Sequence, residues 1–143
     1  MKKGLIITSM ALLTSACSNG DITMQDRTLN PCGDKPNCVS TQDTREQHAL
    51  APFSLAQNAS IDSIEQAALS LGRAQTAVKQ TDYLRIEYTS RVFRFIDDLE
   101  LKIQDGKLLV RSESRTGHSD FGVNRERADK LRQALVEADQ ITP

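Results

Sequence analysis

The sequence predicts a single α+β domain in which an antiparallel sheet of three to four strands has two helices packed on one face. Three observations predict it: a helical pattern of apolar residues near residue 65, a β-hairpin centred on residue 105, and a second helical pattern near residue 130. The chain has 143 residues and a formal net charge of −1. This length suits one domain over residues 31–143, and the interspersed charges give no reason to expect a nucleic-acid partner.

The first residues predict a secretory signal peptide, 1–16, rather than part of the fold. Lys2 and Lys3 precede an apolar run over residues 4–13 that is too short for a permanent membrane span, and small residues lead up to Cys17. A cysteine at this place resembles the lipobox of bacterial lipoproteins, which implies that Cys17 is lipidated and becomes the mature N-terminus. The serine after it favours the outer membrane, so the resemblance implies a cell-envelope protein held at the membrane by lipid and facing the periplasm. The alternative is an ordinary secreted protein in which this cysteine is incidental.

Residues 17–30 are polar and lack periodicity, which predicts a tether between the lipid and the domain. The following segment, 31–40, is a tight loop framed by Cys32 and Cys38. In an oxidising compartment these two cysteines are expected to form a disulfide, since lipid takes the remaining one. A metal site is a weaker alternative because only His48 lies nearby, and the spacing differs from the Cys-x-x-Cys of redox proteins.

The first half of the domain contains one predicted helix and one predicted strand region. Residues 41–58 are expected to be an extended approach segment. Apolar residues then recur at helical spacing between Ser60, which can cap the start of the helix, and Gly72, which can end it. Residues 76–88 are rich in β-branched and aromatic side chains and predict a strand, with a short separate strand at 77–79 as an alternative division.

The hairpin over residues 92–115 is the clearest structural signal. Asp105 and Gly106 supply the positive φ that a type I′ turn requires, and such a two-residue turn fixes the register, so that Asp97 faces Ser114. The face expected to meet the core carries Phe93, Phe95, Asp97, Leu99, Leu101 and Ile103. Asp97 is the exception on this face and must find hydrogen-bond donors, unless a β-bulge turns it outward.

A second helix is expected over residues 121–138, with Asp120 or Asn124 as its cap. Its start follows the end of the hairpin, so polar side chains are expected to gather there. The candidate cluster comprises Asp97, Arg111, Ser114, Arg115, Gly117, Asp120, Asn124, Arg125 and Arg127. A helix start presents free N–H groups and a positive dipole end, which together with several arginines suit an anion such as phosphate or carboxylate.

Three blocks of the sequence resemble one known family. They are "PCGDKPNCVSTQ" (31–42), "FRFIDDLELKI" (93–103) and "VRSESRTGHSDFGVNRERADKLRQAL" (110–135). They resemble the signature blocks of a bacterial and plastid family catalogued as domain of unknown function 1499, with departures at Gly33 and Thr41. The resemblance implies a family without an assigned activity, often secreted or in lipoprotein form, and it carries over no catalytic residue.

The residues leave three interpretations of the candidate cluster open. In the first, Asp97 is a buried buttress that accepts hydrogen bonds from Ser114, Arg115 or Asn124 and locks the helix onto the sheet. In the second, the arginines clamp a small anionic ligand at the helix start. In the third, a hydrolase-like enzyme uses Asp97 with Ser114 or Ser119.

The functional expectation is a non-enzymatic module. It would bind a small anionic ligand or an envelope protein partner through the 111–127 region, with no metal and no cofactor. The adjacent residues of "HSD" (118–120) do not favour an enzyme, because neighbours in sequence point in different directions and rarely form a catalytic relay.

Overall fold

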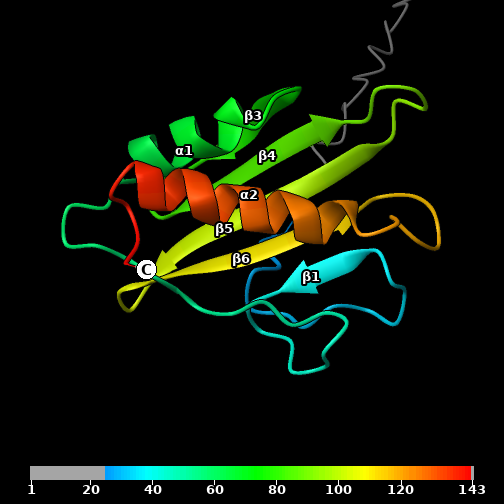
Figure 1. Ribbon diagram of the computed structural model, residues 1–143, viewed down its shortest axis with the longest axis horizontal. Helices are drawn as coiled ribbons and strands as arrows, with labels where there is room; N and C mark the ends of the chain where they lie inside the picture. The colour runs from blue at the N-terminus through cyan, green and yellow to red at the C-terminus, as the bar shows by residue number, and fades with distance from the viewer. Residues whose placement is uncertain (1–24, 143) are drawn as a thin grey trace, which may run out of the picture.

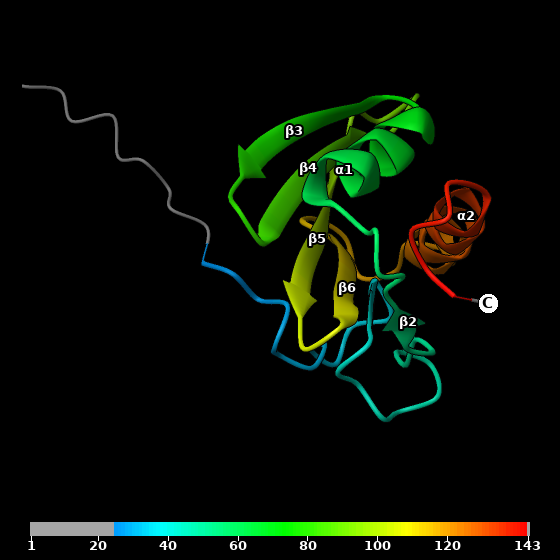
Figure 2. The ribbon, with the colours of Figure 1, turned by 90° about the vertical axis from the view of Figure 1, so that its left-hand side faces the viewer.

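Six strands pair antiparallel in one sheet, and both helices cover the same face of it (Figures 1 and 2). The computed structural model describes residues 25–142, so the predicted signal peptide and Cys17 lie outside the described residues. The elements in chain order are β1 (Cys38–Ser40), β2 (Phe53–Ser54), α1 (Ile61–Ser70), β3 (Ala74–Lys79), β4 (Tyr83–Thr89), β5 (Ile96–Gln104), β6 (Lys107–Ser114) and α2 (Val123–Glu137). The α+β class is therefore as predicted, but the sheet is larger than three to four strands.

The additional strands are short or divided. β1 and β2 span three and two residues, too few for an alternating pattern to be recognised in the sequence. The single strand expected over 76–88 is in fact two strands, β3 and β4, which pair with each other. The turn between them closes where the Gln80 N–H donates to the Tyr83 carbonyl at 2.8 Å. The alternative prediction, a separate short strand at 77–79, is closer to this arrangement than the single strand.

The β5–β6 hairpin has the register predicted from its turn. Asp105 and Gly106 have φ values of 50° and 71°, and Asp97 faces Ser114. The strand order is β1-β6-β5-β4-β3, with β2 also pairing to β6, so the hairpin lies in the middle of the sheet. The ends of β4 and β6 and the start of β5 therefore meet at one end of the sheet, which we call the loop end.

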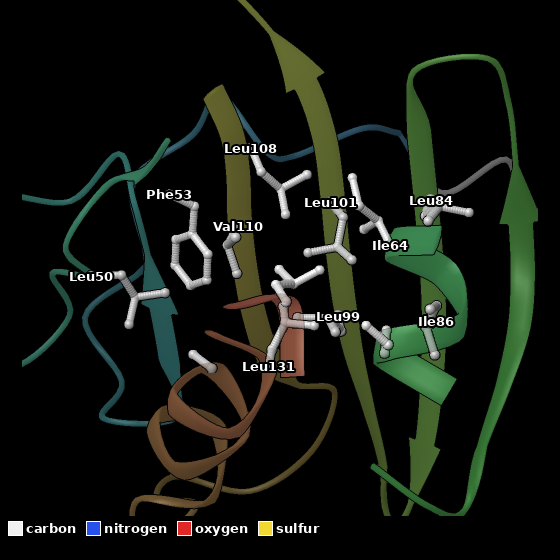
Figure 3. Close-up of a cluster of buried hydrophobic side chains, with 14 of the residues drawn as sticks. Leu50, Phe53, Ile64, Leu84, Ile86, Leu99, Leu101, Leu108, Val110 and Leu131 are labelled. Carbon is white, nitrogen blue, oxygen red and sulfur yellow. The ribbon is translucent and has the colours of Figure 1, made fainter. Parts of the chain in front are cut away.

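The hydrophobic core fills the space between the sheet and the two helices. In Figure 3, Ile64 of α1 and Leu131 of α2 point toward the apolar side chains of the central strands. Those strand residues include Leu84, Ile86, Leu99, Leu101, Leu108 and Val110, all fully or almost fully buried. Ser60 caps α1 as predicted, because its hydroxyl accepts a hydrogen bond from the Ser63 N–H at 3.2 Å.

Phe93 and Phe95 do not join this core, so the expectation that the core face extends to residue 93 is wrong. β5 begins only at Ile96, and the alternation of faces applies only within a paired strand. The preceding residues form a loop closed by the Ser90 N–H, which donates to the Phe95 carbonyl at 2.8 Å. Arg94 within it has a φ of 56°, which breaks the extended backbone and leaves both rings exposed.

The opposite face of the sheet carries charged side chains, and residues 26–31 lie along it. The Arg27 side chain donates to Glu100 at 2.8 Å and to Glu113 at 2.6 Å, and Thr28 beside it is fully buried. This part of the segment expected to be a tether is therefore packed against the domain. Within residues 25–142, none of the helices combines the length and the apolar character needed to cross a membrane.

Candidate functional site

Asp97 points toward the helices, as the register predicts, and pairs with Arg127 of α2. The Arg127 Nη2 donates to Asp97 Oδ2 at 2.6 Å, and each of the two side chains is 10% exposed. The guanidinium also lies over the ring of Tyr88, 4.5 Å from its centroid. Burial raises the pKa of the Tyr88 hydroxyl, which donates to the Ala68 carbonyl at 2.5 Å. The carboxylate is thus neutralised by a cation from α2.

This pairing changes one detail of the buttress interpretation. Ser114, Arg115 and Asn124 were the expected donors to Asp97, whereas the observed donor is Arg127. Arg115 is excluded because its side chain leaves the sheet on the opposite face. Residue 127 lies one helical turn after Asn124, so both side chains point from α2 toward the sheet.

Asn124 connects three segments that are distant in sequence. It is fully buried in the first turn of α2, and its Nδ2 donates to the Asn37 carbonyl at 3.0 Å and to Ser114 Oγ at 2.9 Å. Its Oδ1 accepts from Ser112 Oγ and from Arg127 Nη1, each at 2.6 Å. We call Asp97, Ser112, Ser114, Asn124 and Arg127 the buried polar cluster.

The residues that lead into α2 shape this helix start. Gly122 holds the N-cap position, so the prediction of Asp120 or Asn124 as the cap is wrong. The Asp120 carboxylate nevertheless accepts from the backbone N–H groups of Gly122 and Asn124, both at 2.9 Å. Gly117 has a φ of 90°, and its carbonyl accepts from Asn37 Nδ2 at 3.2 Å. Arg125 donates to the Ala49 carbonyl at 3.0 Å and thereby holds the loop before β2.

The remaining two arginines of the candidate cluster lie on the opposite face of the sheet. Arg115 forms two hydrogen bonds to the carboxylate of Asp98, at 2.7 and 2.8 Å, and also contacts Glu87. These bonds raise the pKa of Arg115 above its ordinary value. Arg111 donates to the carbonyls of residues 30 and 31 at 3.0 and 2.9 Å and to Glu113 at 3.0 Å. We call this set, with Arg27 and Glu100, the far-face network.

The geometry of the buried polar cluster favours a structural role over a chemical one. The Asp97 carboxylate accepts from Arg127, and the Ser114 hydroxyl accepts from Asn124. Among the described residues, no hydrogen bond links Asp97 to Ser114 or to Ser119, whose hydroxyl accepts from the Phe121 N–H at 3.2 Å. A serine nucleophile needs a base within hydrogen-bond reach, and neither serine has one here.

The cysteine loop contains the expected disulfide between Cys32 and Cys38. Asp43 accepts from the Cys32 N–H at 2.9 Å, and Arg45 donates to the Cys32 carbonyl at 2.6 Å. The hydrogen bond from Arg45 holds the pKa of the Asp43 carboxyl well below its usual range. The nearby His48 directs its Nδ1 to the Cys38 carbonyl, 2.9 Å away. In residues 25–142, no three His, Cys, Asp or Glu side chains are arranged to hold a metal ion.

Three other arginines line an open hollow at the loop end. Arg73, Arg91 and Arg94 surround a volume of about 500 Å³ together with Thr89 and Ser90. We call this hollow the arginine groove. Within residues 25–142, none of the three guanidinium groups has an acidic partner or a side-chain hydrogen bond. These three arginines were not predicted as site residues, because they are scattered over two turns and only Arg94 lies within a family-like block.

A second hollow, of about 370 Å³, adjoins the arginine groove. It shares Arg73, Thr89 and Ser90 with that groove. Apolar side chains of Leu71 and Val123 line its walls, together with Tyr88 and the charged side chains of Asp97, Glu126, Arg127 and Lys130. The buried polar cluster therefore borders a space that a small molecule can enter, on the side where the unpaired arginines lie.

Comparison with known proteins agrees with the sequence blocks. The family described as "Protein of unknown function (DUF1499)" matches residues 28–135. The chain belongs to the DUF1499 family. A search of the curated proteins finds no match to it, and a search of the solved structures finds none either.

The DUF1499 match begins at Thr28, inside the segment that lies on the far face of the sheet. It ends at Leu135, the last buried apolar residue of α2. Of the family-like blocks, 110–135 supplies most of β6, the loop after it and most of α2. In this chain the polar residues of that block mainly form hydrogen bonds with one another and with the backbone. A role in holding the fold together therefore explains their presence.

Proposed function

We propose that this DUF1499 protein is a lipid-anchored module of the cell envelope, without enzymatic activity, that binds a small anionic ligand in the arginine groove. The observation that carries the proposal is the set of unpaired guanidinium groups of Arg73, Arg91 and Arg94 around one hollow. Every arginine of the 111–127 region has internal partners, which favours the arginine groove over that region as the anion site.

The chemistry of the arginine groove suits a phosphate or carboxylate. Guanidinium groups donate in a fork geometry that matches both anions, and Thr89 and Ser90 add hydroxyl groups beside them. Arg73 and Arg94 have φ values of 47° and 56°. Left-handed backbone at a non-glycine residue costs about 1 kcal/mol or more and concentrates at functional sites. The adjoining hollow with Leu71 and Val123 would accommodate an apolar portion of the same ligand.

The lipid anchor is supported by the N-terminal residues and by the cysteine usage. Lys2, Lys3 and the apolar run before Cys17 have the layout of a cleaved signal, and a disulfide such as Cys32–Cys38 persists in an oxidising compartment. The expected result is that high salt, which does not release a lipid-anchored protein, extracts the Cys17→Ser variant from the membrane fraction of the producing cell. Unchanged membrane association of this variant would contradict the anchor.

The anion site is tested by titrating inorganic phosphate into isotope-labelled protein and following backbone amide resonances by NMR. Shifts are expected at Arg73, Thr89 and Ser90. Replacing Arg73, Arg91 and Arg94 by glutamine should weaken binding about tenfold or more, since a hydrogen bond to a charged group contributes about 1.5–3 kcal/mol. The matched control is Lys107→Gln, which removes an exposed charge at the opposite end of the sheet. Equal affinity of the triple variant and the control would contradict the site.

A further inference from the structure

The loop end of the sheet exposes large apolar side chains on two neighbouring loops. In the β4–β5 loop, Val92 is 75% exposed, Phe93 74% and Phe95 50%. In the loop before α2, Phe121 is 95% exposed. Such exposure is costly in water, and several large apolar side chains gathered at one end mark an interaction surface rather than scattered surface residues.

The strand register shows that the two loops leave the same end of the sheet. Thr89 at the end of β4 pairs with Ile96 at the start of β5, and Asp97 pairs with Ser114 at the end of β6. The Arg115 N–H donates to the Ile96 carbonyl at 3.0 Å, so the second loop starts beside the first. In Figure 1 both loops extend from this end, the first after β4 and the second before α2.

The apolar residues of the first loop alternate with arginines. The run "RVFRF" (91–95) places Arg91 and Arg94 between Val92, Phe93 and Phe95. The rings of the two phenylalanines stack on each other with centroids 5.5 Å apart, while both arginines line the adjacent groove. Aromatic tips flanked by unpaired cations match the interface of a bilayer, where rings sit at headgroup depth and arginines meet phosphates.

We propose that these two loops insert their apolar side chains into the surface of an anionic phospholipid bilayer, with the arginine groove holding a lipid headgroup phosphate. The proposal rests on the proposed function for the anion site and adds the source of that anion. It adds a second membrane contact, made by the folded domain itself, to the expected lipid anchor.

Charge argues against a second copy of the chain as the partner. Two loop ends brought face to face would place Arg73, Arg91 and Arg94 of one molecule against those of the other. No acidic side chain of the described residues is paired with these arginines, so like charges would oppose the contact. An anionic membrane surface instead provides the complementary charge.

The chain contains no tryptophan, which allows a local test on the full-length protein. Phe93→Trp and Phe121→Trp each place one fluorophore on a loop tip, and Lys107→Trp places one at the opposite end of the sheet as the matched control. Each variant is mixed with vesicles of phosphatidylcholine containing phosphatidylglycerol, with and without brominated acyl chains. Because all three share the same N-terminal residues, any difference among them reports on the domain.

The expected result is a shift of emission to shorter wavelength and quenching by brominated chains for both loop variants but not for Lys107→Trp. Adding Arg91→Gln and Arg94→Gln to Phe93→Trp should raise the lipid concentration needed for half-maximal quenching, about fivefold for each charge removed. Absence of quenching in both loop variants, or equal quenching in the control, would overturn the insertion. A shift that grows with protein concentration without lipid would instead assign the surface to self-association.

The phosphate titration distinguishes failure of this inference from failure of the anion site. If phosphate binds in the arginine groove but neither loop tryptophan reaches the acyl chains, the bilayer inference fails and the anion site stands. If the loops insert equally into neutral vesicles and phosphate does not bind, the headgroup assignment and the anion site both fail.

Discussion

Asp97 and Asp98 are neighbours in β5, but they lead to two different kinds of polar structure. Asp97 faces the helices and pairs with Arg127 inside the buried polar cluster, whereas Asp98 faces away from them and pairs with Arg115 in the far-face network. Both carboxylates are at least nine-tenths buried, and both are bound by an arginine. The difference lies in what else the two arginines hold together.

The buried polar cluster joins parts of the chain that would otherwise separate. Through Asn124 and Arg127 it connects α2, the hairpin and the loop at Asn37, and its hydrogen bonds are closed within the protein. The far-face network lies along one surface of the sheet, and both Arg27 and Arg115 keep 31% of their side chains exposed. Asp97 and Arg127 border the second hollow, but Ser112 and Asn124 are fully buried. Solvent therefore replaces a lost partner less readily in the cluster than in the network, so substitutions should be more costly in the cluster.

The largest effect is expected from Asp97→Ala. Removal of the carboxylate leaves the buried guanidinium of Arg127 without its counter-charge, and breaking a buried pair costs about 3–5 kcal/mol of unfolding free energy. Urea denaturation would measure it. The control is Asp129→Ala, which removes an exposed carboxylate from α2, the helix that carries Arg127. If Asp97→Ala lowered the free energy of unfolding no more than the control does, substitutions in the buried polar cluster would not be more costly than those in the far-face network.

The next effect is expected from Asn124→Ala, at about 2–3 kcal/mol. The substitution leaves the proton of the buried Ser112 hydroxyl without its acceptor and removes one of the two donors to the Asn37 carbonyl, which keeps only the Ser114 N–H. An unsatisfied buried donor costs more than the hydrogen bond itself contributes. Thermal and urea unfolding would both report it, with Gln133→Ala on the exposed side of α2 as the control. A loss accompanied by faster hydrogen exchange of backbone amides in the loop at residue 37 would show that Asn124 holds that loop.

A smaller effect, about 1–2 kcal/mol, is expected from Arg115→Ala. The variant strands the carboxylate of Asp98, but Arg27 lies 3.8 Å from that group and Arg85 4.0 Å from it, so positive charge remains nearby. Its loss of unfolding free energy is compared with that of Arg127→Ala, measured in the same denaturation series. If Arg115→Ala proved the more damaging of the two, the far-face network would be the stronger of the two structures.

The sequence allowed the two faces to be distinguished but not the partners on them to be named. The turn at Asp105-Gly106 fixes a register, and register determines which side chains share a face, so the inward position of Asp97 was predictable. Arg127 was predicted as a member of the cluster but not as the partner of Asp97, because the rotation of α2 over the sheet depends on core packing. Arg111 and Arg115 of the far-face network were predicted as site residues, whereas Arg27 was missed, since it comes from a segment whose composition resembles a tether.

The arginine groove was missed for a related reason. Its residues come from the turn before β3 and from the β4–β5 loop, and the alternation that suggests a strand through Phe93 and Phe95 conceals that loop. A left-handed arginine such as Arg94 cannot be recognised from composition, because only the closure of the loop requires it.

The smallest effect concerns the acid sensitivity of the far-face network. Burial raises the pKa of Glu87, but hydrogen bonds from Arg115 and Gln75 outweigh it and hold the pKa below the ordinary value of 4.5. A carboxyl with a lowered folded-state pKa stabilises the fold above its unfolded pKa, and this contribution is lost as the pH falls through the folded pKa. Glu87→Gln should therefore cost about 0.5–1 kcal/mol near neutral pH.

The difference between the wild-type protein and Glu87→Gln should then shrink as the pH is lowered from about 6 to about 3, because the wild-type carboxyl becomes protonated and loses its charge. Urea denaturation at a series of pH values measures this difference directly. Addition of salt at neutral pH should reduce it as well, since Glu87 and Arg115 lie at the partly exposed margin of the network. A difference that stays constant with both pH and salt would mean that Glu87 contributes through packing, and that the far-face network resembles the buried polar cluster more closely than its exposure indicates.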